Sequence, residues 1–168
     1  MFLNLQELIQ SPEHVVVQVG PVYDTIPQEA PEKLLAALGI DQIQNSVYNK
    51  DTHILLLEIS DCQLLRDLKP NYERLKAAHD HINGVLVTAQ SNDAEYDFEA
   101  RYSWPWSGTN EDPVPGGTHT FLTKYWEERL QKKKMNSFQC SERTGFMTVE
   151  LIGNQQVTIT SKAQIVFE

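Results

Sequence analysis

A strand pattern, a loop rich in proline and glycine and a helix pattern follow one another directly in residues 97–131, DFEARYSWPWSGTNEDPVPGGTHTFLTKYWEERLQ. From about Gly117 to Gln131, apolar side chains recur at helical spacing, namely Phe121, Leu122, Tyr125, Trp126 and Leu130. A stripe of this kind is typical of an α-helix that packs one face into a core. We therefore expect a largely buried helix at residues 117–131.

Short strands and helices alternate before this helix. Strand patterns occur at residues 15–19, 53–59 and 84–89, and helix patterns at residues 32–39, 61–68 and 71–80. The first strand is apolar and β-branched, so we expect it to be buried on both faces. Residues 96–102 alternate aromatic or small residues with charged ones, which predicts a half-exposed strand.

The C-terminal segment predicts an antiparallel sheet. Strand patterns cover residues 138–140, 147–152, 157–160 and 165–167. Gly153 and Asn154 are typical of a two-residue hairpin connection. Taken together, these patterns predict an α+β fold in one domain, residues 1–168, with many short strands around the helix at 117–131.

The composition excludes several classes of partner. The formal net charge is -9 and the isoelectric point is near 5.0, so the long-range field repels nucleic acid. No stretch approaches the roughly 20 apolar residues that span a bilayer, and the N-terminus lacks the basic and apolar regions of a secretory signal. We expect a cytoplasmic protein that binds neither nucleic acid nor membranes.

The cysteines, two of the histidines and the basic cluster do not predict a site. Cys62 and Cys140 form no CxxC pair, which predicts two reduced thiols. His79 and His81 lack a third ligand at the spacing of a zinc site. The lysines at 132–134 are expected to complement the C-terminal end of the helix. We expect no metal and no cofactor.

A candidate anion site lies where the loop meets the helix. The first N–H groups of a helix have no intrahelical partner and lie at the positive end of the helix dipole. Gly116 and Gly117 have no Cβ, so a ligand can approach the backbone closely there. Thr118 and His119 follow in the first turn. The pattern favours a small carboxylate as the ligand of residues 116–119, although a histidine at this position is more often a packed residue.

Asp112 and Arg101 each have two interpretations. Asp112 can face the ligand as a proton acceptor, if burial or a neighbour shifts its pKa toward the working pH. It can also cap the helix or the turn at Pro113, and on spacing alone the cap is favoured. Arg101 can bind a ligand carboxylate or pair with Asp97 or Glu99, and the structural pairing is favoured.

An ordered series of short motifs resembles the phenazine-biosynthesis F-type (PhzF-like) family. In chain order the series is Asp97–Tyr102 with Trp104-Pro105-Trp106, Glu111-Asp112-Pro113-Val114 with two glycines and Thr118-His119, Tyr125-Trp126, and Gln139-Cys140-Ser141 with Arg143. From about residue 13 onward, nearly the whole chain is similar to the C-terminal half of that family.

The resemblance implies a diaminopimelate-epimerase-like fold of two similar lobes with the active site between them. This chain resembles one lobe, the C-terminal one, in which a mostly antiparallel, barrel-like sheet wraps around a central helix. The implied activity is an isomerase or epimerase that shifts a proton on a small carboxylic acid without metal or cofactor. Asp112 matches the family's aspartate, and Gly116 and Gly117 match its substrate-binding helix start.

Two departures from the family pattern bear on activity. The glutamate and the glycine-histidine segment of the family's N-terminal lobe have no counterpart in this sequence. The family's serine is replaced by Gly117, and Pro115 removes a backbone donor. We therefore expect catalysis to require a second lobe in trans. Without that lobe, the face that normally meets it would be exposed, and we expect it to form a homodimer. The alternative is a non-catalytic remnant of a truncated protein, which binds a small anion or a protein partner.

Overall fold

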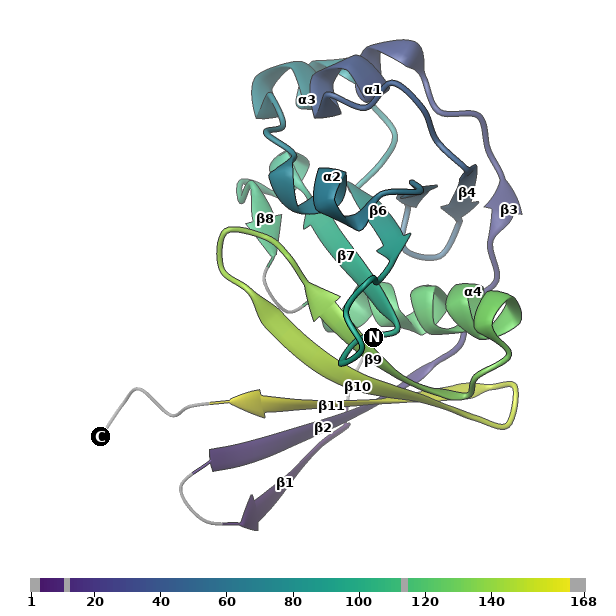
Figure 1. The fold of residues 1–168 in the computed structure, drawn as a ribbon, viewed down its shortest axis with the longest axis vertical. Coiled ribbons are helices and arrows are strands. Elements are labelled where there is room, and N and C mark those ends of the chain that lie inside the picture. Colours follow the sequence, from purple (N-terminus) through teal and green to yellow (C-terminus); the bar gives the residue numbers. More distant parts are fainter. Residues whose placement is uncertain (1–3, 11–12, 113–114, 164–168) are drawn as a thin grey trace.

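Figure 1 shows the computed structural model, which describes residues 4–10, 13–112 and 115–163. Strands and helices alternate along the chain as β1 (Asn4–Gln10), β2 (Glu13–Pro21), β3 (Ile26–Pro27), α1 (Glu32–Leu38), β4 (Asn45–Asn49), β5 (Ile54–Glu58), α2 (Cys62–Asp67), α3 (Tyr72–Ala78), β6 (Gly84–Gln90), β7 (Phe98–Ser103), β8 (Glu111–Asp112), α4 (His119–Leu130), β9 (Lys134–Gln139), β10 (Gly145–Ile152) and β11 (Gln156–Ala163). Short 3-10 turns at Pro105–Ser107 and Gly116–Thr118 complete the described elements.

The described strands join one sheet in the order β1-β2-β11-β10-β9-β7-β6-β5-β4-β3, with β8 paired to β7. Strand β5 is parallel to β6, and β7 is parallel to β9. The other pairs between described strands are antiparallel. This confirms the α+β class and the mostly antiparallel sheet.

Helix α4 lies in the concave side of the sheet, as Figure 1 shows. Its Phe121, Leu122 and Trp126 belong to a core cluster that also contains residues of β4 to β7 and of β9 to β11. The rings of Phe98 and Trp126 stack at 5.5 Å between centroids, with 9° between their planes. The predicted central helix is therefore confirmed, and it begins at His119 because a 3-10 turn occupies residues 116–118.

The remaining helices cover the opposite face of the same sheet. Leu55 and Leu57 of β5 pack with α1 to α3, whereas the alternate residues Ile54 and Leu56 pack with α4. Successive side chains of a strand point to opposite faces, so β5 is buried on both. Figure 1 shows α1, α2 and α3 on the side of the sheet away from α4. All three helices were predicted, and their observed bounds differ from the expected ones by a few residues.

Strand β7 corrects the expectation of a half-exposed strand. All six of its residues are buried, including the charged Glu99 and Arg101. Buried charges are tolerated when they are paired, and each of these has a partner from a distant segment: Arg66 for Glu99 and Glu111 for Arg101. Alternation of charged and apolar residues predicts exposure, because the ion-pair partners come from other segments and are not visible in the local sequence.

Other differences concern the outer sheet and its connections. Val19 in β2 is 39% exposed, so this strand is not buried on both faces. The β10–β11 connection has three residues, 153–155, because Ile152 pairs with Gln156. Strands β1, β3, β4 and β8 were not predicted, and the strand expected at 165–167 lies outside the described residues.

The basic cluster does not extend α4. The helix ends at Leu130, and Gln131 follows in the left-handed conformation with φ 54°. Lys132 then pairs with Asp97, and Lys134 pairs with Glu150 across β9 and β10. Lys132 therefore connects the segment after the helix to Asp97, next to β7, whereas Lys134 links two neighbouring strands. Among the described residues, no helix has the length and apolar character needed to cross a membrane.

Candidate functional site

A pocket of about 440 Å3 forms where the helix start meets the β7–β8 edge, and we call it the Asp112 pocket. It is lined by Thr52, Ile54, Asn83, Tyr102, Trp104, Ser107, Asp112, Pro115, Gly117 and Thr118. Three of the five predicted site residues, Asp112, Gly117 and Thr118, thus share one cavity. Their roles toward a ligand stay predictions.

Asp112 reaches the pocket from a strand and not from a helix cap. It pairs with Tyr102 across the β7–β8 ladder, and its carbonyl oxygen accepts a hydrogen bond of 3.1 Å from the Gln139 side chain. Thr118 occupies the N-cap position of α4. Among the described residues the α4 cap is therefore not Asp112, and pairing with β7 together with the Gln139 side chain fixes its position.

The turn before α4 is held by the carbonyl oxygen of Pro115. This oxygen accepts hydrogen bonds from the Thr118 amide at 3.0 Å and from the Thr118 hydroxyl at 2.8 Å. The hydroxyl of Thr120 donates to Gly117 O at 2.6 Å and secures the following turn. Thr118 is buried, and both its amide and its hydroxyl donate within the turn, so its role is to hold the turn in shape.

The two glycines of this turn have different surroundings. A Cβ added at Gly116 would clash with the end of the Gln18 side chain, so this glycine accommodates a neighbour from β2. A Cβ added at Gly117 would meet no heavy atom within 4 Å. Close approach of a ligand to the backbone is therefore possible at Gly117, which lines the pocket, whereas Gly116 does not line it.

His119 is fully buried behind the pocket and does not line it. Its Nδ1 lies 3.2 Å from Pro115 O, and its Nε2 lies 3.1 Å from Ser137 Oγ. A carbonyl oxygen only accepts, so Nδ1 carries the proton and donates it, and Nε2 accepts from the Ser137 hydroxyl. Both ring nitrogens are thus occupied within the protein.

Burial lowers the pKa of His119 to about 4, against an ordinary value of 6.5, although the hydrogen bond to Pro115 O opposes the shift. Loss of solvation disfavours the imidazolium form. The ring is therefore neutral at pH 7 and connects the Pro115 turn to β9. In this arrangement it supports the helix start and makes no contact with the cavity.

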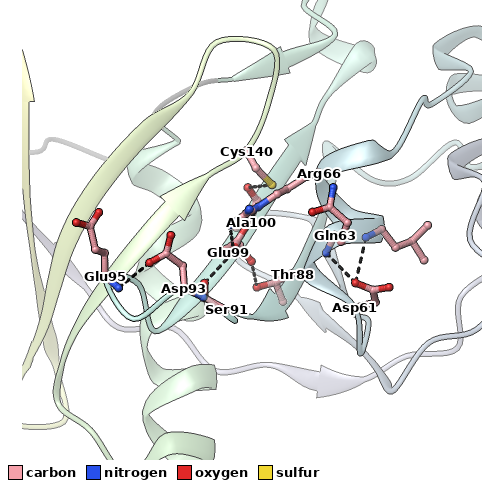
Figure 2. A network of polar contacts seen from close by, with 11 residues as sticks. Asp61, Gln63, Arg66, Thr88, Ser91, Asp93, Glu95, Glu99, Ala100 and Cys140 are labelled. Carbon is pink, nitrogen blue, oxygen red and sulfur yellow. Dashed lines mark hydrogen bonds and ion pairs between the residues drawn. The ribbon is translucent and has the colours of Figure 1, made fainter.

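The opposite face of β7 carries ion pairs that brace the strand (Figure 2). Arg66 donates two hydrogen bonds to the Glu99 carboxylate, at 2.7 and 2.6 Å, and Ser91 donates a third at 2.8 Å. Thr88 donates to the Glu99 carbonyl oxygen at 2.7 Å. Figure 2 shows these groups converging on Glu99 from separate segments. The bonding fixes the strand that carries Tyr102 into the pocket.

Of the two interpretations of Arg101, the structure shows the structural ion pair, but its partner is Glu111, which was not predicted. Its Nε lies 2.5 Å from the Glu111 carboxylate, and its Nη1 donates to Leu68 O at 2.6 Å. Asp97 pairs with Lys132 instead. Glu111 precedes Asp112, so this ion pair also anchors β8 against β7.

Cys62 and Cys140 are free, as expected, and both are buried. Burial raises the pKa of the Cys140 thiol to about 12, so at pH 7 it is a thiol and not a nucleophilic thiolate. In the part of the chain that the structure describes, no group of three His, Cys, Asp or Glu side chains is arranged to hold a metal ion.

Sequence reasoning did not single out Tyr102 or Trp104 as pocket residues. Their rings lie 5.8 Å apart and form the aromatic wall of the cavity. The signal that could have found Tyr102 is strand alternation, which places it on the face opposite Glu99 and Arg101. Its proximity to Asp112 depends on strand pairing, which the sequence does not reveal locally.

Comparisons with known proteins agree with this fold. The sequence model of the family described as "Phenazine biosynthesis-like protein" matches residues 9–168. The chain is 39% identical to mouse "Phenazine biosynthesis-like domain-containing protein 1" over 168 residues, covering 93% of this chain and 58% of that protein. It is 36% identical over 121 residues to an uncharacterized isomerase of Halalkalibacterium halodurans, covering 72% of this chain and 44% of that protein.

A solved structure shares the architecture. The crystal structure of a phenazine biosynthesis PhzC/PhzF protein from Clostridium difficile has a TM-score of 0.78 and 26% identity, covering 97% of this chain and 61% of that chain. The chain thus spans about three fifths of the length of the mouse protein and of the Clostridium difficile protein. The family match over residues 9–168, together with these relatives, shows that this chain belongs to the phenazine biosynthesis-like (PhzF) family.

Proposed function

We propose that this chain supplies one lobe of an isomerase that moves a proton on a small carboxylic acid. The observation that carries the proposal is the Asp112 pocket, where a carboxylate, an open backbone at Gly117 and the turn that leads into α4 line one cavity. Relatives that carry the word isomerase in their names support the reaction class.

The two ends of the pocket suit different parts of such a ligand. The backbone N–H groups at the start of α4 favour an anion because of the helix dipole. Asp112 projects from β8, so it can receive a proton from a carbon of the bound acid. The proton removed is returned to another carbon, or to the opposite face of the same carbon, so the reaction needs no oxidant or reductant.

We propose further that a second lobe in trans completes the site. Exposed apolar side chains are available for such a contact, among them Val19, Phe146 and Ile152. A homodimer across this face is the competing arrangement. Binding of a small anion without turnover is the competing function, and Gly117 in place of the family's serine favours it.

The experiment has two parts. The protein is purified from its own source, and its native mass and the chains that accompany it are determined. The preparation is then incubated in D2O with small carboxylic acids, and mass spectrometry follows deuterium incorporation. We expect a one-to-one complex with a second chain and incorporation that Asp112→Asn reduces strongly. A 19.2 kDa monomer or its homodimer, inactive on every acid, would favour the binding function.

A further inference from the structure

Tyr102 is a second polar group in the Asp112 pocket. It lines the cavity and lies opposite Asp112 in the antiparallel β7–β8 pair. Directly opposed residues of such a pair have Cβ atoms about 5 Å apart on the same face of the sheet. Among the described residues, no hydrogen bond to the Tyr102 hydroxyl is found, although the side chain is only 5% exposed. The hydroxyl therefore has unused hydrogen-bonding capacity beside Asp112.

The position of the phenol ring is fixed by its neighbours. The ring rests on Gly84 of β6, where an added Cβ would clash with both the ring edge and the hydroxyl oxygen of Tyr102. On the other side, Trp104 packs at 5.8 Å between ring centroids. A glycine is needed at position 84 so that the Tyr102 ring can approach the β6 backbone closely, and not because of its backbone conformation. A rigidly held donor loses little entropy when it binds a ligand.

We propose that the Tyr102 hydroxyl donates a hydrogen bond to a second oxygen of the ligand, whose carboxylate lies at the Gly117 backbone. The inference rests on the proposed function for the placement of the carboxylate. It adds a ligand-binding residue that discriminates between acids. The preferred ligands are small acids with a hydroxyl or carbonyl oxygen remote from the carboxylate, within a cavity of about 440 Å3.

The phenol stays protonated under the conditions in which it has to donate. Burial, assisted by the nearby Asp112 charge, raises the pKa of Tyr102 above its ordinary value of 10. Both causes disfavour the phenolate, because it would be poorly solvated and would repel the carboxylate. Tyr102 therefore offers a neutral O–H to the ligand while Asp112 offers an acceptor.

Selectivity is the consequence that can be measured. A site that hydrogen-bonds a ligand oxygen rejects an analogue without it, because the protein donor is then left unpaired. 4-Oxopentanoate and 4-methylpentanoate have nearly the same shape, and differ in whether the fourth carbon carries an oxygen or a methyl group. We expect the unaltered chain to bind 4-oxopentanoate more tightly.

The experiment is an NMR titration of the chain with each acid, followed through its backbone and indole N–H signals. Tyr102→Phe should weaken 4-oxopentanoate binding about 2- to 10-fold, the effect of losing one hydrogen bond, and leave 4-methylpentanoate binding unchanged. Tyr96→Phe is the matched control, since Tyr96 stacks on Phe138 and does not line the pocket. Gly84→Ala, which displaces the phenol without removing it, should also abolish the preference.

The inference would be overturned if Tyr102→Phe weakened the binding of both acids equally. It would also be overturned if the unaltered chain bound both acids with equal affinity, or bound neither. The proposed proton shift is tested separately by deuterium incorporation. If incorporation is absent and the preference for the oxo acid depends on Tyr102, the binding role stands and the isomerase proposal fails. If incorporation depends on Asp112 and Tyr102→Phe changes no affinity, the isomerase proposal stands and the role of Tyr102 is refuted.

Discussion

The buried imidazole of His119 should make the folded state less stable in mild acid. Its pKa is about 4 in the folded protein and 6.5 when unperturbed. Between these values the unfolded chain binds a proton that the folded chain does not, so stability is lost as pH falls from 6.5 toward 4. The difference of about 2.5 pKa units at about 1.36 kcal/mol each corresponds to about 3 kcal/mol.

Urea unfolding at pH 7.5, 6, 5 and 4.5 measures this loss. His119→Gln should be less stable at pH 7.5, because the bonds to Pro115 and Ser137 are altered, and it should lose less stability on acidification than the unaltered chain. The matched control is His81→Gln, which replaces an exposed imidazole. Parallel pH dependence of the His119→Gln and unaltered chains would refute the reasoning. NMR titration of the His119 ring in the unaltered chain provides a direct check, and a midpoint near 6.5 would also refute it.

The ion pair on the other face of β7 and the glycine turn give two further predictions. Glu99→Gln should cost about 1 to 3 kcal/mol in urea unfolding, because the neutral amide cannot replace all the hydrogen bonds that Arg66 and Ser91 donate to the fully buried carboxylate; a cost below about 0.5 kcal/mol would contradict the assigned bracing role. Gly117→Ser should change the melting temperature little, since its Cβ meets open space, and should tighten carboxylate binding in NMR titration by adding a donor to the pocket. Gly116→Ser should lower the melting temperature because it displaces Gln18, and the opposite ranking of the two serine variants would show that the turn is wrongly described.

Local patterns were sufficient for the central helix and for the strands with dense β-branched residues. Helix α4 could be predicted because Phe121, Leu122, Tyr125, Trp126 and Leu130 recur at helical spacing. Burial of the consecutive residues 119–123 adds to this stripe and was not visible in the sequence. Strand β4 has only Val47 and Tyr48 as large apolar residues, and its place in the sheet comes from pairing with β5. Weak strands of this kind are fixed by their neighbours and not by their own sequence.

The part of the candidate site that comes from one short segment of the chain could be predicted. Asp112, Gly117 and Thr118 lie within seven residues, so a loop followed by a helix start brings them together. Tyr102 joins them only through strand pairing with Asp112. His119 shares the segment, but its partner Ser137 lies 18 residues away, and that contact turns the ring inward.

The most direct test of the proposed function is deuterium incorporation into small acids by the native assembly. Acids extracted from the source cells are incubated in D2O with the purified protein and whatever chain accompanies it, and then with the same assembly that carries Asp112→Asn. The account predicts incorporation at a carbon-bound position of one acid and its loss, by at least about 100-fold, in the variant. Equal incorporation by both assemblies would remove Asp112 from the chemistry, and no incorporation by a complete one-to-one assembly would contradict the isomerase function.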